Sequence, residues 1–189
     1  MKQELQRKFF HITLGIFFLI IIYLFGIEQS FNVVFSLFFI GLIIALALQH
    51  GIKLPFTKRM ISIVEREHEK HFPGSAALIF IFATLLILFF FKDVNIVLAA
   101  LSVSIFADTL AALIGKKFGK HVIVKKKHYT KTVEGTLTCF VVALIILFLF
   151  VPLWIALIGS IIATAVEFLP VNDNIGIPLF VGVVLKLLL

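Results

Sequence analysis

A chain of 189 residues that is 61% hydrophobic and only 14% charged carries more apolar surface than one soluble core can bury. With a mean hydropathy of +1.17, this composition excludes an ordinary soluble domain and predicts an all-α integral membrane protein. The net charge of +7 would suit either nucleic acid or an anionic membrane face. The basic residues gather between apolar runs, which favours the membrane, and we expect no nucleic-acid partner.

Seven apolar runs follow one another along the chain. Most reach the roughly 17 to 25 residues that a helix needs to cross a bilayer, and the last is shorter. The runs are continuous instead of alternating, which predicts helices and not a membrane β-barrel. We therefore expect a single transmembrane catalytic domain over residues 1–189, with about seven spans. The runs cover residues 9–25, 31–48, 74–91, 96–114, 133–151, 153–169 and 175–189.

The basic residues are distributed asymmetrically over the loops. Fifteen of the 17 lysines and arginines precede the first run or lie between runs two and three or four and five. These three segments share one side of the membrane, so the positive-inside rule places them, and the N-terminus, in the cytoplasm. Residues 51–74 form a polar stretch whose apolar residues recur near helical spacing, which predicts a short helix on the cytoplasmic interface.

Asp108 is an acidic residue inside the fourth apolar run. Ala111, Ala112 and Gly115 share its helical face, at spacings of three, four and seven residues. The carboxylate could serve close helix packing, bonded to a hydroxyl or a lysine, although carboxylates within spans are functional in most cases. Alternatively, the small neighbours leave room for a ligand at a metal site.

Three further carboxylates are expected at the same cytoplasmic boundary as Asp108. Glu134 opens the fifth run, Glu167 closes the sixth, and Asp173 lies in the loop that follows. Mg²⁺ usually takes one or two carboxylates and completes its shell with phosphate and water. The sequence therefore predicts a Mg²⁺ site formed by Asp108, Glu134, Glu167 and Asp173.

Three short motifs at this boundary are candidates for binding phosphate. Lysines and glycines form a flexible, positive turn after the fourth run, which is equally typical of a loop that meets anionic lipid. The stretch "KTVEG" puts a cation and a hydroxyl at a helix start, where anions bind, although a plain helix cap would explain it too. "PVNDN" is either a ligand loop or a capped turn. The residues concerned are Gly115, Lys116 and Gly119, then Lys131, Thr132, Glu134 and Gly135, then Asn172 and Asn174.

These motifs together resemble the membrane family of CTP-dependent lipid kinases, which includes dolichol kinase, phytol kinase and CTP-dependent diacylglycerol kinase. The similarity extends over nearly the whole chain, and the order and spacing of its pieces are more specific than any one of them. The matching pieces are "RKFFH" at residues 7–11, an R-E-x-E-like stretch at 66–69, D-x-x-A-x-x-x-G-x-x-x-G at 108–119, "KTVEG" at 131–135, and Glu167 followed by "NDN".

The resemblance implies a reaction and its residues. A member of this family would transfer the γ-phosphoryl group of Mg²⁺-CTP to the hydroxyl of a membrane lipid alcohol, such as a polyprenol, dolichol, phytol or diacylglycerol, at the cytoplasmic face. Arg7, Lys8, Asp108 and Gly115 match positions that the family needs for activity. The central motifs match its cytidine-nucleotide site.

Two alternatives remain open at this point. Phosphatidate cytidylyltransferases share the mid-chain elements, but they carry a C-terminal signature with K-D and paired aspartates after an H-G-G, where this sequence has "EFLPVNDNIGIP". A small transporter could use Asp108 and Glu167 to relay protons or bind an ion. Against a transporter, the polar residues crowd one boundary and do not line a path across the bilayer.

Overall fold

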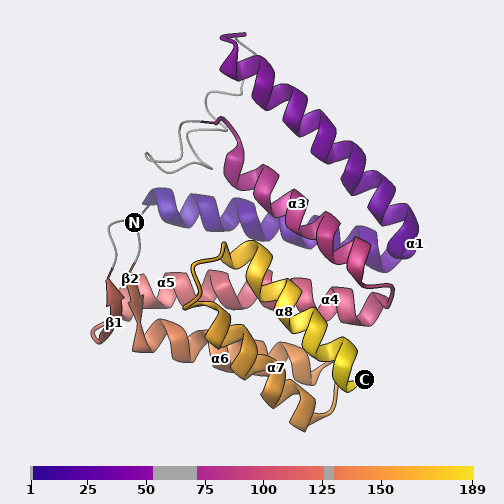
Figure 1. The fold of residues 1–189 in the computed structure, drawn as a ribbon. Helices are drawn as coiled ribbons and strands as arrows, with labels where there is room; N and C mark the ends of the chain where they lie inside the picture. The colour runs from indigo at the N-terminus through magenta and orange to yellow at the C-terminus, as the bar shows by residue number, and fades with distance from the viewer. Residues whose placement is uncertain (1, 53–71, 126–129) are drawn as a thin grey trace. The chain divides into compact units, whose positions relative to one another are not determined.

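The computed structural model describes residues 2–52, 72–125 and 130–189. Helices make up nearly all of the described chain, with one short pair of strands (Figure 1). The chain divides into two compact units, Met1–Phe90 and Phe91–Leu189, and each is described by itself.

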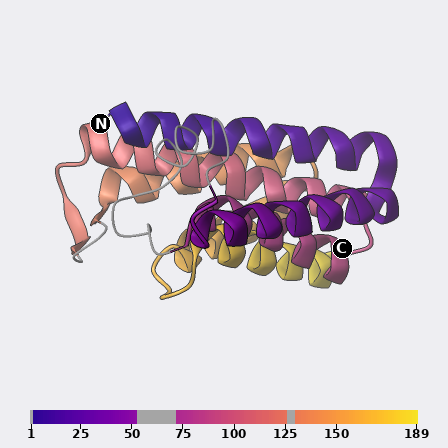
Figure 2. The same ribbon diagram turned by 90° about the horizontal axis from the view of Figure 1, so that it is seen from above.

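The first unit consists of a long broken helix and a second helix packed against it. Helix α1, Lys2–Gln49, reverses direction at Gly26, whose φ of 72° suits a residue without a Cβ (Figure 2). Its two arms correspond to the first two predicted runs. Helix α3, Ser75–Phe90, packs on α1, and the ring of Phe80 lies 5.9 Å from that of Phe18 and 4.4 Å from that of His11.

The second unit begins with a helix that changes its winding midway. Helix α4, Val94–Ser102, continues through one π-helical segment, η2 (Val103–Ala107), into α5, Asp108–Phe118. The side chain of Asp93 starts α4 by accepting hydrogen bonds from the backbone N–H groups of Asn95 and Ile96.

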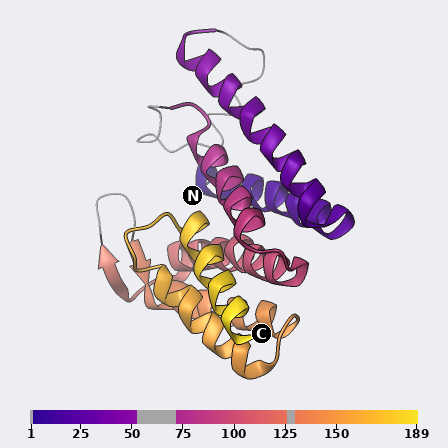
Figure 3. The same ribbon diagram turned by 45° about the vertical axis from the view of Figure 1, so that its right-hand side comes forward.

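A hairpin and three more helices complete the second unit. Strand β1, Val122–Lys125, pairs antiparallel with β2, Thr130–Thr132, and the hairpin leads into α6, Val133–Phe148. Helix α7, Leu153–Val166, packs against α6, and α8, Asp173–Leu188, packs against α7 and α4 (Figures 1 and 3). This bundle brings the start of α6, the end of α7 and the start of α8 to the same end.

Every predicted apolar run is helical in the structure. Within the described residues, two helices are long and apolar enough to cross a membrane, Leu5–Gln49 and Val94–Phe118, and the second of these is mostly buried. Helices α3, α6 and α7 are apolar but shorter. The number of spans and the cytoplasmic N-terminus stay predictions. Most of the predicted interfacial segment, and all of the R-E-x-E-like stretch at 66–69, lies outside the described residues.

Candidate active site

A lysine and two carboxylates form an ion cluster in the second unit, at the end of the bundle where the hairpin lies. The Lys131 ammonium is 3.3 Å from Glu167 Oε1 and 3.1 Å from Asp173 Oδ2. Lys131 comes from β2, Glu167 follows the last residue of α7, and Asp173 is the first residue of α8. Lys131 thus meets two carboxylates that lie 36 and 42 residues further along the chain, on either side of the α7–α8 connection.

The ion cluster extends from the surface into the interior. The side chain of Asp173 is 30% exposed, that of Lys131 is 19% exposed, and that of Glu167 is only 2% exposed. While Glu167 Oε1 is bonded to Lys131, Glu167 Oε2 is buried and has no hydrogen-bond partner in the part of the chain that the structure describes. An unpaired oxygen in a buried carboxylate is costly, which makes this atom the most unusual in the cluster.

Asp108 belongs to the same neighbourhood. It is buried at the first position of α5, directly after η2, and it acts electrostatically on Lys131. Burial by itself would lower the pKa of the Lys131 ammonium, but the charges of Asp173, Glu167 and Asp108 outweigh that effect and raise the pKa above its usual value. Lys131 is therefore positively charged at neutral pH.

The glycines after Asp108 pack against the start of α6. A Cβ on Gly119 would lie 2.7 Å from Thr132 Oγ1, and one on Gly135 would lie 3.0 Å from the Ala111 carbonyl oxygen. The absence of these side chains lets α5 approach the β2–α6 junction closely. Thr132 also caps α6, because its Oγ1 accepts a hydrogen bond from the Gly135 N–H. A packing role for Gly115, Gly119 and Gly135 thus accompanies the predicted nucleotide role.

Glu134 contacts His121 and not Lys131. Its Oε1 is 2.8 Å from His121 Nδ1, and both of its carboxylate oxygens accept from the His121 backbone N–H. Among the described residues, no three His, Cys, Asp or Glu side chains are grouped so that they could hold a metal ion. The structure therefore brings Asp108, Glu167 and Asp173 near one cation and pairs Glu134 with His121, and the four-carboxylate Mg²⁺ site stays a prediction.

The remaining predicted site residues lie as follows. Asn172 Oδ1 accepts from the Asn174 N–H and caps α8, which is the turn that the sequence allowed for. Lys116 is exposed in the last turn of α5. Arg7 and Lys8 are in the first turns of α1, in the other unit. Their part in activity, which the resemblance implies, stays a prediction.

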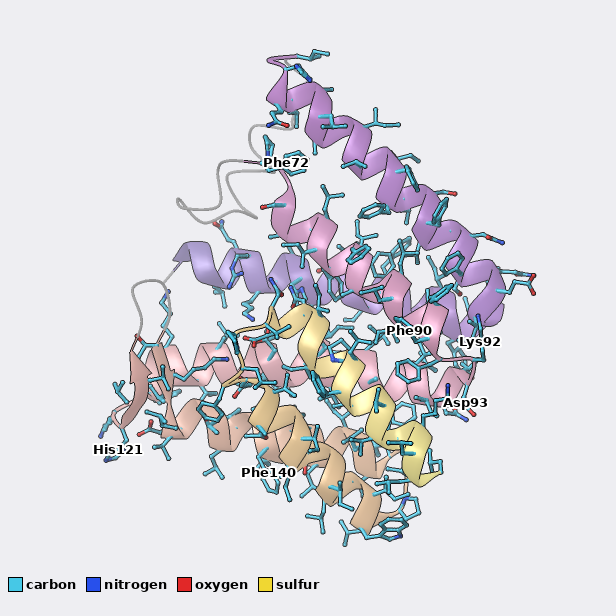
Figure 4. The ribbon with its side chains drawn as sticks, viewed as in Figure 1. Phe72, Phe90, Lys92, Asp93, His121 and Phe140 are labelled. Atoms are coloured by element: carbon cyan, nitrogen blue, oxygen red, sulfur yellow. The ribbon has the colours of Figure 1, made fainter. Side chains whose placement is uncertain are left out.

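An apolar groove runs along the outside of α6 and α7. Its volume is about 490 Å³, within the range of about 300–1,000 Å³ that is common for small-molecule sites. Phe140, labelled in Figure 4, and Phe168, the residue after Glu167, contribute aromatic rings to it. The other lining residues are Ile123, Val133, Thr136, Leu137, Ile161, Thr164 and Ala165.

A comparison with protein-family models finds a match to the cytidylyltransferase family over residues 1–185. The chain belongs to the cytidylyltransferase family. Membership implies a membrane enzyme of the transferase class whose substrates are CTP and a lipid. Neither kinase activity nor a particular lipid follows from it.

One relative of this cytidylyltransferase-family chain is an uncharacterized protein of Methanocaldococcus jannaschii. The two sequences are 26% identical over 190 residues, covering 97% of this chain and 93% of the relative. No solved structure matches the chain.

Two helix N-termini lie at the ion cluster of this cytidylyltransferase-family chain. The N-termini of α6 and α8 begin two residues after Lys131 and at Asp173, so both helix ends lie beside the ion cluster. Helix N-termini carry free N–H groups and partial positive charge. Lys131 and these helix ends stay predicted phosphate contacts, and they lie beside the negative charges of Glu167, Asp173 and Asp108.

Two features of this site have no signal in the sequence. The contact between His121 and Glu134 joins residues 13 apart with no motif spacing, and it depends on the β1–β2 hairpin, which lies where the sequence suggested only a lysine-rich loop. The π-helical segment before Asp108 is also unmarked, because its residues, "VSIFA", are ordinary for an apolar helix.

Proposed function

We propose that this protein is a CTP-dependent kinase that transfers the γ-phosphoryl group of CTP to the hydroxyl of a membrane lipid alcohol. The observation that carries the proposal is the ion cluster of Lys131, Glu167 and Asp173 beside Asp108 and two helix N-termini. Phosphoryl transfer does not require a covalent intermediate with the protein. It depends on positioning and on neutralising charge that develops on oxygen.

Lys131 and Asp173 each have a proposed part in receiving CTP. Lys131 and the start of α6 contact phosphoryl oxygens of CTP. The acceptor oxygen forms the new bond to the γ-phosphorus, the bond to the bridging oxygen breaks, and CDP leaves with a proton released from the hydroxyl. Asp173, the most exposed member, faces the aqueous side from which CTP arrives, which we propose is the cytoplasm.

We propose that Mg²⁺ binds beside Asp108 and Asp173. Asp108 and Asp173 both act on Lys131, so they lie in one neighbourhood, and they offer carboxylate oxygens, which are the ligands that Mg²⁺ prefers. One or two carboxylates suffice because phosphate and water complete the shell, so no cage of three protein ligands is needed. When bound, Mg²⁺ would neutralise charge on the CTP oxygens.

A second candidate is a phosphatidate cytidylyltransferase, and the family match favours it as much as the kinase. That enzyme would join the cytidylyl group of CTP to phosphatidate and release pyrophosphate. The stretch "EFLPVNDNIGIP", which differs from the cytidylyltransferase signature, supports the kinase. The apolar groove on α6 and α7 is compatible with a lipid in either reaction.

The two reactions can be separated by the position of the label in CTP. Purified protein in detergent would be incubated with Mg²⁺ and either γ- or α-labelled CTP, together with undecaprenol, phytol, dioleoylglycerol or phosphatidate. We expect the γ-label, and not the α-label, to enter a lipid when an alcohol is present. Transfer of the α-label to phosphatidate would instead establish the cytidylyltransferase, and no labelled alcohol with any acceptor would refute the kinase.

A further inference from the structure

Glu167 Oε2 differs from the other carboxylate oxygens of the site. Both oxygens of Glu134 accept from His121, and Asp173 is partly exposed to water and bonded to Lys131. The side chain of Glu167 is only 2% exposed. Its Oε1 accepts a hydrogen bond from Lys131, and its Oε2 has no hydrogen-bond partner among the described residues. A buried acceptor with nothing to accept from indicates a missing donor.

The chemistry of the missing donor can be narrowed. It must carry a hydrogen and be small, since Glu167 lies at the innermost point of the ion cluster. A hydroxyl satisfies both conditions. A phosphate monoester does not, because its oxygens are mostly deprotonated at neutral pH and then have no hydrogen to donate.

We propose that Glu167 Oε2 accepts a hydrogen bond from the hydroxyl of the lipid acceptor, and that this contact makes the site select an alcohol over phosphatidate. The inference rests on the proposed kinase function and deepens it by assigning the residue that recognises the acceptor. Lys131, which holds Glu167 Oε1 at 3.3 Å, fixes the carboxylate and at the same time lies where the incoming phosphoryl group needs a cation. One lysine thus places the acceptor oxygen and the phosphate side by side.

The first experiment uses the unmodified protein and changes the ligand. The best acceptor from the labelling panel and the methyl ether of the same lipid would compete for binding in mixed micelles without nucleotide. The ether keeps the chain but lacks the hydroxyl hydrogen, so we expect it to bind at least ten-fold more weakly. Equal binding of ether and alcohol would overturn the proposal, even if the protein proves to be a kinase.

The second experiment compares two substitutions that each remove one carboxylate contact from Lys131. We expect Glu167→Gln to raise the KM for the lipid alcohol at least ten-fold with little change in the KM for CTP, and Asp173→Asn to do the reverse. Glu28→Gln, in an exposed acid of α1, is the unaffected control. If Glu167→Gln instead shifts the Mg²⁺ concentration for half-maximal rate and leaves the alcohol KM unchanged, Glu167 is a metal ligand and the proposal is wrong.

The outcomes separate this inference from the kinase proposal. A wild-type protein that labels no alcohol refutes the kinase, whatever Glu167 does. A wild-type protein that labels an alcohol, together with an unchanged alcohol KM in Glu167→Gln, refutes only the role of Glu167. Because the ether competition needs no variant, a Glu167→Gln protein that fails to fold does not prevent a decision.

Discussion

At the level of single residues, Lys131 compensates buried negative charge, and in the proposed reaction it also presents a cation to phosphate. Glu167 is almost fully buried and Lys131 is its hydrogen-bonded cation. Removing one partner of a buried ion pair leaves the other uncompensated, which is more costly than removing both. A double substitution of Lys131 and Glu167 should therefore be less destabilising than the substitution of Lys131 alone, although both should abolish activity.

We expect Lys131→Met to lower the free energy of unfolding by about 3 kcal/mol, because the Glu167 charge loses its partner. The double variant Lys131→Met/Glu167→Gln should recover most of that stability, since the buried charge is gone too. Neither variant should phosphorylate lipid. Thermal denaturation in detergent measures the first effect, and γ-labelled CTP measures the second. A double variant less stable than Lys131→Met would show that the ion pair does not control stability.

Asp108→Asn tests the acidic residue that the sequence placed inside a span. We expect phosphate transfer to fall by about 100-fold or more, as is typical when one preorganised electrostatic contact to a reacting group is removed. The protein should stay folded, since asparagine keeps the shape of the side chain. Initial rates with γ-labelled CTP, alongside the melting temperature, check this expectation. Near-normal turnover would remove Asp108 from the site.

The sequence singled out the residues of the ion cluster, but it did not predict which of them contact one another. Asp108, Lys131, Glu167 and Asp173 stand out because charged residues are rare in and beside apolar runs, and the structure does bring them near one another. The pairing of Glu134 with His121 was not predictable, because it depends on the register of a hairpin. The spacing of residues in the sequence predicts which of them share a face of a helix. Contacts between segments that are far apart in the sequence can be known only from the three-dimensional structure.

Among the secondary-structure elements, the α4–η2–α5 helix and its contact with α6 position the site. A π-helical turn inserts extra residues into a helix and often accompanies a functional position, and here it ends directly before Asp108. Gly115 and Gly119 then allow Thr132 to lie against α5. Helix winding before Asp108 and glycine packing beside Thr132 thus both shape the part of α5 that faces the β2–α6 junction.

Two glycine substitutions with different neighbours test this packing. A Cβ on Gly119 would clash with Thr132 Cγ2 at 2.6 Å and with the Gly115 carbonyl oxygen, whereas one on Gly159 would meet the end of the flexible Leu147 side chain, Cδ1, at 2.7 Å. We expect Gly119→Ala to cost about 1–3 kcal/mol and Gly159→Ala less than about 1 kcal/mol. Activity should fall only in Gly119→Ala. Melting temperatures measure the change in stability, and transfer rates measure the change in activity. Equal losses in the two variants would show that the close packing of α5 against the β2–α6 junction has no particular importance for activity.

For the whole molecule, the sequence predicted the helices well and their connections less well. Long apolar runs form helices in any low-dielectric surrounding, because each backbone group must be paired within its own segment. Gly26, which separates the first two runs, is the point where α1 reverses. The β1–β2 hairpin was not predicted, since its short strands lie in a lysine-rich segment without alternation of apolar and polar residues.

The orientation of the chain in the membrane is the remaining prediction at this scale. Lys92 and Asp93 precede α4, and His121 follows α5, so they lie at opposite ends of one continuous helix (Figure 4). The positive-inside rule assigns the His121 end to the cytoplasm. The native Cys139 is fully buried, so the unmodified protein should not react with a membrane-impermeant maleimide and serves as the blank.

Two exposed lysines allow this orientation to be measured. We expect Lys120→Cys to be labelled by the maleimide only in inside-out vesicles, and Lys92→Cys only in right-side-out vesicles or intact cells. Both lysine side chains are exposed in the structure. A cysteine that fails to react would therefore lie on the far side of the membrane from the reagent, and would not be shielded by the protein. Labelling of both variants from the same side would mean that the α4–α5 helix does not cross. Labelling with the reverse polarity would place the ion cluster away from cytoplasmic CTP, which a CTP-dependent enzyme of this kind could not tolerate.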